Sequence, residues 1–340
     1  MQQKYMLKCI ELAKLAEGET SPNPMVGCVI TDEFDNVIAT GYHKKCGANH
    51  AEREALLKIK KGDGDTLYVN LEPCSHYGKT PPCVDLIIEK KIKNVVIGML
   101  DPNPKVSGIQ KLIEAGIHVT VGVMEEECKK LNEVFIKNIE KKKTFVAIKT
   151  ATTLDGKIAT SIGSSKWITS EDARAEVRNI RHRYDAVLTS SSTVLMDNPT
   201  MAHIKKVILD RKLKTKLTHN IFKEGDIYVF NGLKDEVVEN VHYIKTPCMD
   251  GKISLEFVFN KLYELGIMSV LIESGGKLNG RALKYADKIY HFMAPKIAGD
   301  NAAKSCFNYR EISMISECEN FKIDKVEFFS PDILLTYYPV

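Results

Sequence analysis

The sequence of 340 residues lacks several features that would assign it to a broad class of protein. No apolar run approaches the ~20 residues that a helix needs to cross a bilayer, so no membrane association is expected. The first residues, MQQKYMLKCIELAKLAEGE, do not contain the apolar stretch of a signal peptide, which favours a cytoplasmic protein. They predict instead an amphipathic helix with Leu7, Ile10 and Leu15 on its apolar stripe.

The sequence also lacks an excess of one charge sign. Its 48 Lys and Arg residues stand against 44 Asp and Glu residues, and the net charge of +4 is shared almost evenly by the two halves. Phosphate-backbone binding usually depends on a clustered basic excess, so no nucleic-acid partner is expected. The nine cysteines are an odd number in a chain without a recognisable secretory signal. We therefore expect reduced thiols, and we interpret cysteine pairs first as metal ligands.

Short runs rich in valine and isoleucine alternate with helical patterns along the whole chain. The runs cover residues 26–30, 66–70, 94–99 and 119–124, and then 145–151, 185–190, 206–210, 227–230, 269–273 and 289–295. Helices are predicted over 125–140, 170–183 and 255–265. This alternation predicts two α/β domains with covered sheets. The lysines at 141–143 suit a solvated helix end, so we place the domains at 1–143 and 144–340.

The clearest chemical signal lies in the first domain. The segment CGANHAEREALLKI places His50 and Glu52 at the start of a helix, with Asn49 near its cap, and LEPCSHYGKTPPC supplies Cys74 and Cys83 after a strand. One imidazole and two thiolates suit Zn²⁺ and leave a fourth position for water, whose pKa falls to about 7 on zinc. Glu52 is two residues from a ligand, so it can take a proton from that water and deliver it to leaving ammonia.

The other interpretations of this segment give its residues a structural role without catalysis. The histidine and cysteines could be ordinary structural residues, or they could form a structural zinc site, although such sites usually recruit a fourth protein ligand. Cys46 is the nearby candidate for that fourth ligand. The simpler interpretation is that Cys46 is a loop residue without a role in metal binding. His43 and His76 either line the pocket or are hydrogen-bonded structural residues. The pattern H-x-E followed by P-C resembles the zinc deaminases, but eight residues instead of two separate the cysteines.

The sequence of the second domain contains fewer motifs that indicate a function by themselves. No G-x-G-x-x-G follows its first strand, which disfavours a Rossmann dinucleotide fold. Its best phosphate-binding candidate is Glu273-Ser274-Gly275-Gly276, a strand end with glycines before a predicted helix, although such a turn is more often only a turn. Trp167, the only tryptophan, is most simply a core residue.

Taken together, the motifs resemble the bifunctional deaminase–reductases of riboflavin biosynthesis over nearly the whole chain. The segments that carry the resemblance are SPNPMVGCVI (21–30), GYHKKCGANHAEREAL (41–56), LEPCSHYGKTPPC (71–83), DPNPKVSGIQKLIEAGI (101–117), KTATTLDGKIAT (149–160), SSKWITS (164–170), SSSTVLMDNP (190–199) and IESGGKLNG (272–280). The long insert between Cys74 and Cys83 separates this family from cytidine and tRNA-adenosine deaminases.

The resemblance implies a cytidine-deaminase-like three-layer α/β/α domain followed by a dihydrofolate-reductase-like α/β domain. The first would bind Zn²⁺ and deaminate a diaminopyrimidinone ribosylamine phosphate, and the second would use NADPH to reduce the ribosyl group to a ribityl chain. Homologues often form dimers, so a homodimer or higher homo-oligomer is expected. The alternatives are a nucleic-acid base deaminase with an appended binding domain, and a zinc-containing scaffold without activity.

The resemblance also assigns residues in the second domain. Positions that contact NADPH in the family match Ala151, Trp167, Thr193, Asp197, Gly275, Gly276, Lys277 and Leu278, and those that hold the substrate match Ser165, Arg181, Met201 and Glu273. A guanidinium binds phosphate in a bidentate fork, which would suit Arg181.

One segment departs from the family. The family has an arginine shortly after the Asp197-Asn198-Pro199 turn, which this chain lacks, and the expected substitutes are His203, Lys205 or Lys206. We therefore hypothesise weaker substrate binding in the reductase half.

Overall fold

The computed structural model describes residues 2–75, 77, 81–201 and 205–340. The chain divides into two compact units, Met1–Lys142 and Lys143–Val340, and each has its own core. Both units are α/β, as the sequence predicts. In the part of the chain that is described, every helix is too short or too polar to cross a membrane.

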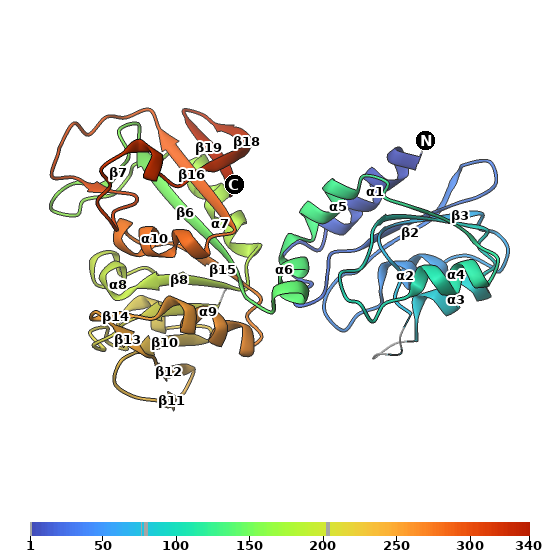
Figure 1. The fold of residues 1–340 in the computed structure, drawn as a ribbon, viewed down its shortest axis with the longest axis horizontal. Helices are drawn as coiled ribbons and strands as arrows, with labels where there is room; N and C mark the ends of the chain where they lie inside the picture. The colour runs from blue at the N-terminus through green and yellow to red at the C-terminus, as the bar shows by residue number, and fades with distance from the viewer. Residues whose placement is uncertain (1, 76, 78–80, 202–204) are drawn as a thin grey trace. The chain divides into compact units, whose positions relative to one another are not determined.

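The first unit is a five-stranded sheet with helices on both faces (Figure 1). Strand order is β2-β1-β3-β4-β5, with β1 antiparallel to both neighbours and β3, β4 and β5 parallel. Helices α1 and α5 pack on one face, and α2 and α3 lie on the other. The elements are α1 (Gln2–Lys14), β1 (Gly27–Thr31), β2 (Val37–Tyr42), α2 (Ala51–Leu56), β3 (Thr66–Leu71), α3 (Cys83–Glu89), β4 (Asn94–Met99), α4 (Gly108–Glu114), β5 (His118–Val121), α5 (Glu125–Leu131) and α6 (Glu133–Lys141).

Two helix predictions in this unit need correction. The buried face of α1 contains Met6, Cys9, Ile10 and Ala13, whereas Leu7 and Leu15 of the predicted stripe are exposed. The predicted helix over 125–140 is interrupted at residue 132, between α5 and α6.

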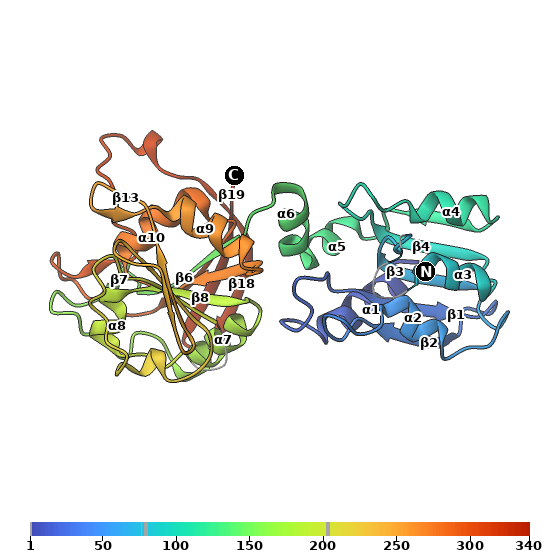
Figure 2. The ribbon, with the colours of Figure 1, turned by 90° about the horizontal axis from the view of Figure 1, so that it is seen from below.

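The second unit is built on a ten-stranded sheet, ordered β11-β12-β10-β9-β8-β15-β6-β16-β19-β18. The strands from β12 to β16 in this order are parallel, and β11, β19 and β18 run antiparallel to their neighbours. Helices α9 and α10 lie on one face and α7 on the other (Figure 2). The main elements are β6 (Phe145–Thr153), α7 (Glu171–His182), β8 (Ala186–Ser190), α8 (Ser191–Asp197), β9 (Lys205–Leu209), β10 (Ile227–Asn231), β11 (Glu236–Val238), β12 (Val241–Lys245), α9 (Leu255–Glu264), β15 (Ser269–Ile272), α10 (Gly276–Ala282), β16 (Lys288–Ala294), β18 (Phe321–Phe329) and β19 (Asp332–Pro339).

Small elements complete this unit. They are the short strands β7 (Lys157–Ala159), β13 (Cys248–Met249), β14 (Lys252–Ile253) and β17 (Lys304–Ser305), and the 3₁₀ turns η1 (Asn220–Phe222), η2 (Leu283–Tyr285) and η3 (Ile315–Glu317). Because its central strands are parallel, their carboxyl ends meet at one edge, where open α/β sheets bind ligands. The edge is formed by the ends of β6, β8 and β15.

Candidate functional site: a zinc centre and a charged cluster

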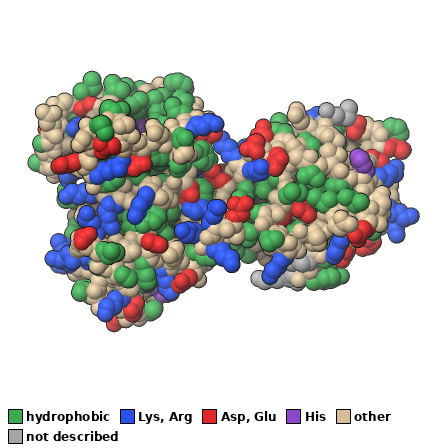
Figure 3. All heavy atoms as spheres, in the orientation of Figure 1, with side chains coloured by type: hydrophobic (Ala, Val, Ile, Leu, Met, Phe, Trp, Pro, Cys, Tyr) green, Lys and Arg blue, Asp and Glu red, His purple; other side chains and the backbone are tan. Residues whose placement is uncertain are grey.

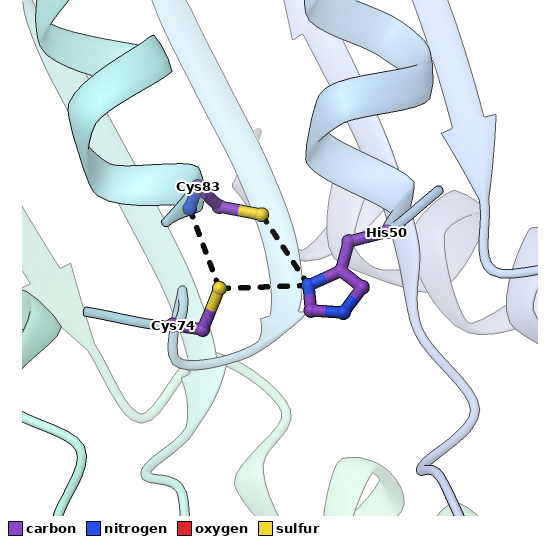
Figure 4. A group of neighbouring side chains, drawn as sticks. All are labelled: His50, Cys74 and Cys83. Carbon is purple, nitrogen blue, oxygen red and sulfur yellow. Dashed lines mark hydrogen bonds between the residues drawn. The ribbon is translucent and has the colours of Figure 1, made fainter. Parts of the chain in front are cut away.

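Three side chains of the first unit converge on one point (Figure 4). His50 directly precedes α2, Cys74 lies in the loop that follows β3, and Cys83 is the first residue of α3. The Nδ1 atom of His50 lies 3.5 Å from the Sγ atoms of both cysteines, and all three ligand atoms lie within 4.8 Å of one another. The predicted ligands are therefore brought together by two helix starts and one strand end.

The spacing of these atoms fits a tetrahedral zinc ion. With Zn–S near 2.3 Å and Zn–N near 2.0–2.1 Å, a nitrogen and a sulfur ligand on a tetrahedron are roughly 3.5 Å apart, and the two measured distances are 3.5 Å. Cys46 is exposed and is not part of the convergent group, so it is not a fourth ligand in this arrangement. Three protein ligands leave one coordination position for water, as in catalytic zinc sites.

Electrostatics within the group already favour a thiolate. Hydrogen bonding from the Cys83 thiol and from His50 holds the pKa of Cys74 below its usual value, despite partial burial. The same hydrogen bond and burial raise the pKa of Cys83. A divalent cation removes this asymmetry because it deprotonates a coordinating thiol outright.

Glu52 lies in the first turn of α2 and is only 3% exposed. Burial, and then the negative charge of Cys74, raise the pKa of its carboxyl to about 7, and a hydrogen bond with Cys83 opposes this rise. Since Glu52 faces the ligand group without belonging to it, its carboxyl is placed to exchange protons with a molecule bound there.

His43 is a hydrogen-bonded neighbour of the ligand group. Its ring packs edge-on against His50, with centroids 5.7 Å apart. Nδ1 lies 3.0 Å from the carbonyl oxygen of Asn49, and Nε2 lies 3.1 Å from the amide nitrogen of Asn23. These partners are both satisfied by a neutral ring with its hydrogen on Nδ1. Burial lowers the pKa of His43, which also favours the neutral form. His76 lies outside the described residues.

The loop that carries Cys74 is fastened to the segment before α4. Glu72 accepts hydrogen bonds from the backbone of Gly108 and Ile109, at 2.9 and 3.2 Å. Ser75 accepts one from Ser107 N at 2.8 Å. A Cβ atom on Gly108 would lie 2.2 Å from the carbonyl oxygen of Pro73, so only glycine permits this approach.

A second support holds the segment that carries Asn23. The buried Asn132 amide bonds both backbone groups of Met25, accepting from N at 2.8 Å and donating to O at 3.0 Å. The buried Asn70 amide also donates to Met25 O and accepts from Gly27 N. Asn132 is the residue between α5 and α6, so this contact accounts for the interruption of the predicted helix. The sequence pattern did not indicate the contact between Asn132 and Met25.

In the second unit, a charged cluster lies at the carboxyl edge of the sheet. Glu273 follows β15 and is 9% exposed. Its carboxylate accepts from Arg181 Nε at 2.5 Å and Nη2 at 3.0 Å, and Lys149 Nζ lies 3.3 Å away. Lys149 was not singled out from the sequence, although a lysine within an otherwise apolar strand is a detectable signal.

This cluster corrects one expectation about Arg181. The Nε–Nη2 edge of its guanidinium is already bonded to Glu273, so this edge is not open to a phosphate in the structure. Arg181 and Glu273, both predicted to hold the substrate, are bonded to each other, and their contact with the substrate stays a prediction. Glu273, directly after β15, thereby orients Arg181 of α7 and Lys149 of β6.

Hydroxyl groups and glycines gather beside the cluster. Ser274 Oγ donates to Ser190 Oγ at 2.9 Å and lies 3.4 Å from Thr193 Oγ1. A Cβ atom on Gly275 would meet no atom within 4 Å, and its φ is an ordinary −79°. Protein packing therefore does not demand a glycine at Gly275, whereas close approach of a ligand would. Gly276 differs, because its Cβ would lie 2.2 Å from Ser305 O.

The other predicted cofactor residues differ in their exposure and in their position on the fold. Ala151 lies on β6 and shares a face with Lys149. Lys277 is exposed, whereas the Leu278 side chain is buried and its N–H bonds Gly275 O, so neither group of Leu278 is open to a ligand. Asp197 is exposed at the end of α8.

Trp167 is not a core residue, which corrects the sequence interpretation. It is 63% exposed, and the Arg174 guanidinium lies 4.3 Å from its ring centroid. Ser165, two residues earlier, is half-buried. Met201 is buried with a positive φ of 44°.

Two of the proposed substitutes for the missing arginine are wrong. Lys205 and Lys206 lie at the start of β9, paired with Ala186 and Val187, whereas Ser190 at the site pairs with Leu209. Four residues of strand separate the two ends by roughly 13 Å. Lys206 is also buried, and its ammonium group donates to the carbonyls of Ile221 and Glu224. His203 lies outside the described residues.

Two protein-family models match the chain, one in each of its two units. Residues 1–99 match the cytidine and deoxycytidylate deaminase zinc-binding region, and residues 144–335 match the RibD C-terminal domain. The riboflavin biosynthesis protein RibD of Actinobacillus pleuropneumoniae is 40% identical, with 98% of this chain and 94% of that protein covered. The protein of the same name from Aquifex aeolicus is 38% identical, with coverages of 98% and 97%.

Solved structures agree over the full length. A diaminohydroxyphosphoribosylaminopyrimidine deaminase/5-amino-6-(5-phosphoribosylamino)uracil reductase from Thermotoga maritima superposes with a TM-score of 0.92 at 41% identity, covering 100% of this chain and 99% of that one. Acinetobacter baumannii RibD gives a TM-score of 0.89 at 33% identity, with the same coverages. The predicted fold class, a cytidine-deaminase-like domain followed by a dihydrofolate-reductase-like domain, is confirmed.

Proposed function

Because the chain belongs to the RibD family of bifunctional enzymes of riboflavin biosynthesis, we propose specific roles for the residues of its two sites. The chain is a zinc-dependent deaminase and an NADPH-dependent reductase that acts on small molecules. Its substrate is the diaminopyrimidinone ribosylamine phosphate named for the Thermotoga maritima protein. The single observation that carries the assignment is the convergence of His50, Cys74 and Cys83 beside the buried Glu52.

In the first unit, His50, Cys74 and Cys83 hold the zinc ion. When bound, Zn²⁺ lowers the pKa of a water molecule to about 7 and so allows attack at neutral pH. Glu52 accepts the proton that the water loses as it attacks the amino-bearing ring carbon. Glu52 then delivers that proton to the departing nitrogen as the carbon–nitrogen bond breaks, and ammonia leaves. A carboxyl whose pKa is raised toward neutrality can serve in both steps.

In the second unit, the substrate phosphate and ribose are held near Lys149, Arg181 and Ser165, with Glu273 orienting the two cations. Met201 is proposed to contact the substrate as well, because it matches a substrate-binding position of the family. The open space over Gly275 accepts the phosphate part of NADPH, assisted by Gly276 and the exposed Lys277. NADPH, when bound, supplies the hydride that reduces the ribosyl group.

Ala151, Trp167, Thr193 and Asp197 complete the proposed cofactor contacts. The Trp167 ring is 63% exposed, so much of its surface is accessible to a ligand. Leu278 would contribute only to the core beneath.

Substrate binding in the reductase site is proposed to be weaker than in relatives that carry an arginine after the Asp197-Asn198-Pro199 turn. Lys205 and Lys206 lie at the far end of β9, which supports this proposal. Side-by-side measurement should give a higher reductase KM than an arginine-bearing homologue, and an equal or lower KM would refute it.

The enzyme is proposed to work in the cytoplasm as a homo-oligomer, without a nucleic-acid partner. All nine cysteines are free thiols in the structure, which suits a reducing compartment. The near balance of charge gives no support to a polyanionic partner.

The test is incubation with the diaminopyrimidinone phosphate, with and without NADPH, followed by mass spectrometry. We expect exchange of an amino group for oxygen without NADPH, and a further gain of two hydrogens with it. Glu52→Gln should keep its zinc but lose deamination by about 10²–10⁴-fold, while still reducing the deaminated product. Retention of both zinc and deaminase activity in this variant would show that Glu52 is not the proton carrier.

A further inference from the structure

The segment from Trp167 to Ser170 lies between β7 and α7 and is held by side chains from other parts of the unit. It consists of turns and bends, so the hydrogen bonds of a sheet or helix do not fix it. The Arg174 guanidinium on α7 donates to the carbonyl oxygen of Thr169 at 2.7 Å. At the end of the segment, the Asp332 carboxylate accepts from the backbone N–H of Ser170 at 2.6 Å. Side chains therefore bind backbone groups that a neighbouring strand would bind in a sheet.

The start of this segment is held by Lys296. Its ammonium group donates to the carbonyl oxygens of Trp167 at 3.0 Å and of Ile168 at 2.7 Å. These contacts cross 129 and 128 residues, so no local sequence pattern indicates them. Hydrogen bonds from a charged donor are shorter and stronger than those between neutral groups. Lys296 thus fixes the backbone of the tryptophan.

Lys296 itself extends from a backbone that is fixed on both sides. It follows the carboxyl end of β16, and its carbonyl oxygen accepts from the N–H of Leu154 at 2.7 Å, in the turn after β6. The Asp155 carboxylate of the same turn accepts from the N–H groups of Ala298 and Gly299, at 3.0 and 2.9 Å. Because β6 and β16 are neighbouring parallel strands, both ends lie at the carboxyl edge of the sheet, where such folds bind ligands.

The ring of Trp167 is held as well as its backbone. The Arg174 guanidinium lies 4.3 Å from the ring centroid, a distance at which a cation is attracted to an aromatic face. The ring is still 63% exposed. Other hydrophobic side chains also reach the surface of this unit, so exposure alone assigns no role (Figure 3). The Trp167 ring is distinguished by the number of polar contacts that set its position.

We propose that Lys296 is a positioning residue of the reductase, which presents the Trp167 ring to NADPH by binding the carbonyl groups of Trp167 and Ile168. A side chain that is already held in its binding geometry loses less conformational freedom when the ligand binds, so the affinity is higher. The inference rests on the part of the proposed function that places Trp167 at the cofactor. It gives Lys296 no direct contact with NADPH, because the ammonium group donates to protein carbonyls.

Reductase kinetics of the full-length protein with the deaminated product test this role. Lys296→Met keeps a side chain of similar length but removes its donors. It should raise the KM for NADPH on the order of tenfold and leave kcat within about twofold, because cofactor binding alone is weakened. Lys296→Arg keeps charged donors and should restore most of the affinity. The matched control is Lys223→Met, at an exposed lysine before β10, which should leave the KM unchanged.

The fluorescence of Trp167 gives a measurement that needs no cofactor, because Trp167 is the only tryptophan of the chain. Its steady-state anisotropy without NADPH should fall in Lys296→Met, since a ring on a released backbone moves more freely. Lys296→Arg and Lys223→Met should keep the wild-type anisotropy. A wild-type anisotropy in Lys296→Met would overturn the positioning role.

Trp167→Ala separates the inference from the function on which it rests. This variant should also have a raised KM for NADPH, and a wild-type KM would overturn both the cofactor contact and the inference. A raised KM in Trp167→Ala with a wild-type KM in Lys296→Met would overturn the inference alone. Adding Lys296→Met to Trp167→Ala should have little further effect, because residues that act through one another are not additive. An undiminished effect there would show that Lys296 acts on NADPH directly and would overturn the positioning role.

Discussion

Glu273→Gln removes the negative charge on which Arg181 and Lys149 converge. Burial raises the pKa of Glu273, but attraction to Lys149 and then Arg181 outweighs burial and lowers the pKa from 4.5 to about 2. A shift of this size corresponds to about 3 kcal/mol of stabilisation of the folded state at pH 7. Removing one partner of a buried ion pair costs about 3–5 kcal/mol in other proteins, so the two magnitudes agree. We expect the variant to be less stable by about 3 kcal/mol at pH 7.

The dependence on pH has a defined sign. Because the pKa of Glu273 is lower in the folded state, its contribution is complete above the ordinary value of 4.5 and is lost as the pH falls through about 2. The difference between wild type and Glu273→Gln should therefore shrink steadily over this interval. A cause unrelated to ionisation, such as altered packing, would leave the difference constant.

Trp167 gives a probe confined to the reductase unit, because it is the only tryptophan of the chain. Urea unfolding followed by its fluorescence should show the loss for Glu273→Gln. Glu264→Gln is the control, since Glu264 forms an exposed ion pair with Lys261 on α9 and should change stability by less than about 1 kcal/mol. Equal stability of wild type and Glu273→Gln at pH 7 would refute the proposed role of the charge cluster.

Three further predictions concern the two sites. Gly275→Val should leave stability unchanged and raise the KM for NADPH, whereas Gly276→Val should destabilise the fold because its Cβ meets Ser305 O; an unaltered KM for Gly275→Val would remove the cofactor from this position. Asn132→Ala breaks both hydrogen bonds to Met25 and should destabilise the first unit by about 1–3 kcal/mol, measured by thermal unfolding; a change within about 0.5 kcal/mol, the usual range for surface sites, would refute it. Removal of zinc with a chelator should abolish deamination and spare reduction of the deaminated product, and loss of both activities would contradict separate sites.

The zinc centre could be predicted from the sequence because its residue types and their order match a known zinc motif. Glu52 lies in the first turn of α2, directly after the cap residue His50, and Cys74 and Cys83 bracket one loop, so motif spacing fixes the arrangement within each pair. The buried strands were also predictable, since runs such as 94–99 are apolar on both faces and bounded by turns. The meeting of His50 with Cys74 and Cys83, across 24 and 33 residues, was inferred from the motif and not from local structure.

The reductase site could not be predicted to the same depth, because it depends on distant contacts. Glu273 meets Arg181 across 92 residues and Lys149 across 124 residues. Sequence alone suggested that the Arg181 fork was free, since a guanidinium offers the same donors to a carboxylate and to a phosphate. The exposure of Trp167 is likewise a property of the folded surface, and composition favours the opposite expectation.

The interruption between α5 and α6 shows that tertiary contacts override the local helical pattern, and it bears directly on the deaminase. Residues 125–140 have good helical periodicity, but Asn132 is drawn out of it by two hydrogen bonds to Met25, 107 residues away. Met25 belongs to the segment whose Asn23 contacts His43, and His43 in turn contacts Asn49, the neighbour of His50. The support of the zinc ligands therefore extends well past residue 99, where the match to the zinc-binding region ends. A deaminase fragment that ends there would lose this support, because Asn132 lies between α5 and α6, beyond residue 99.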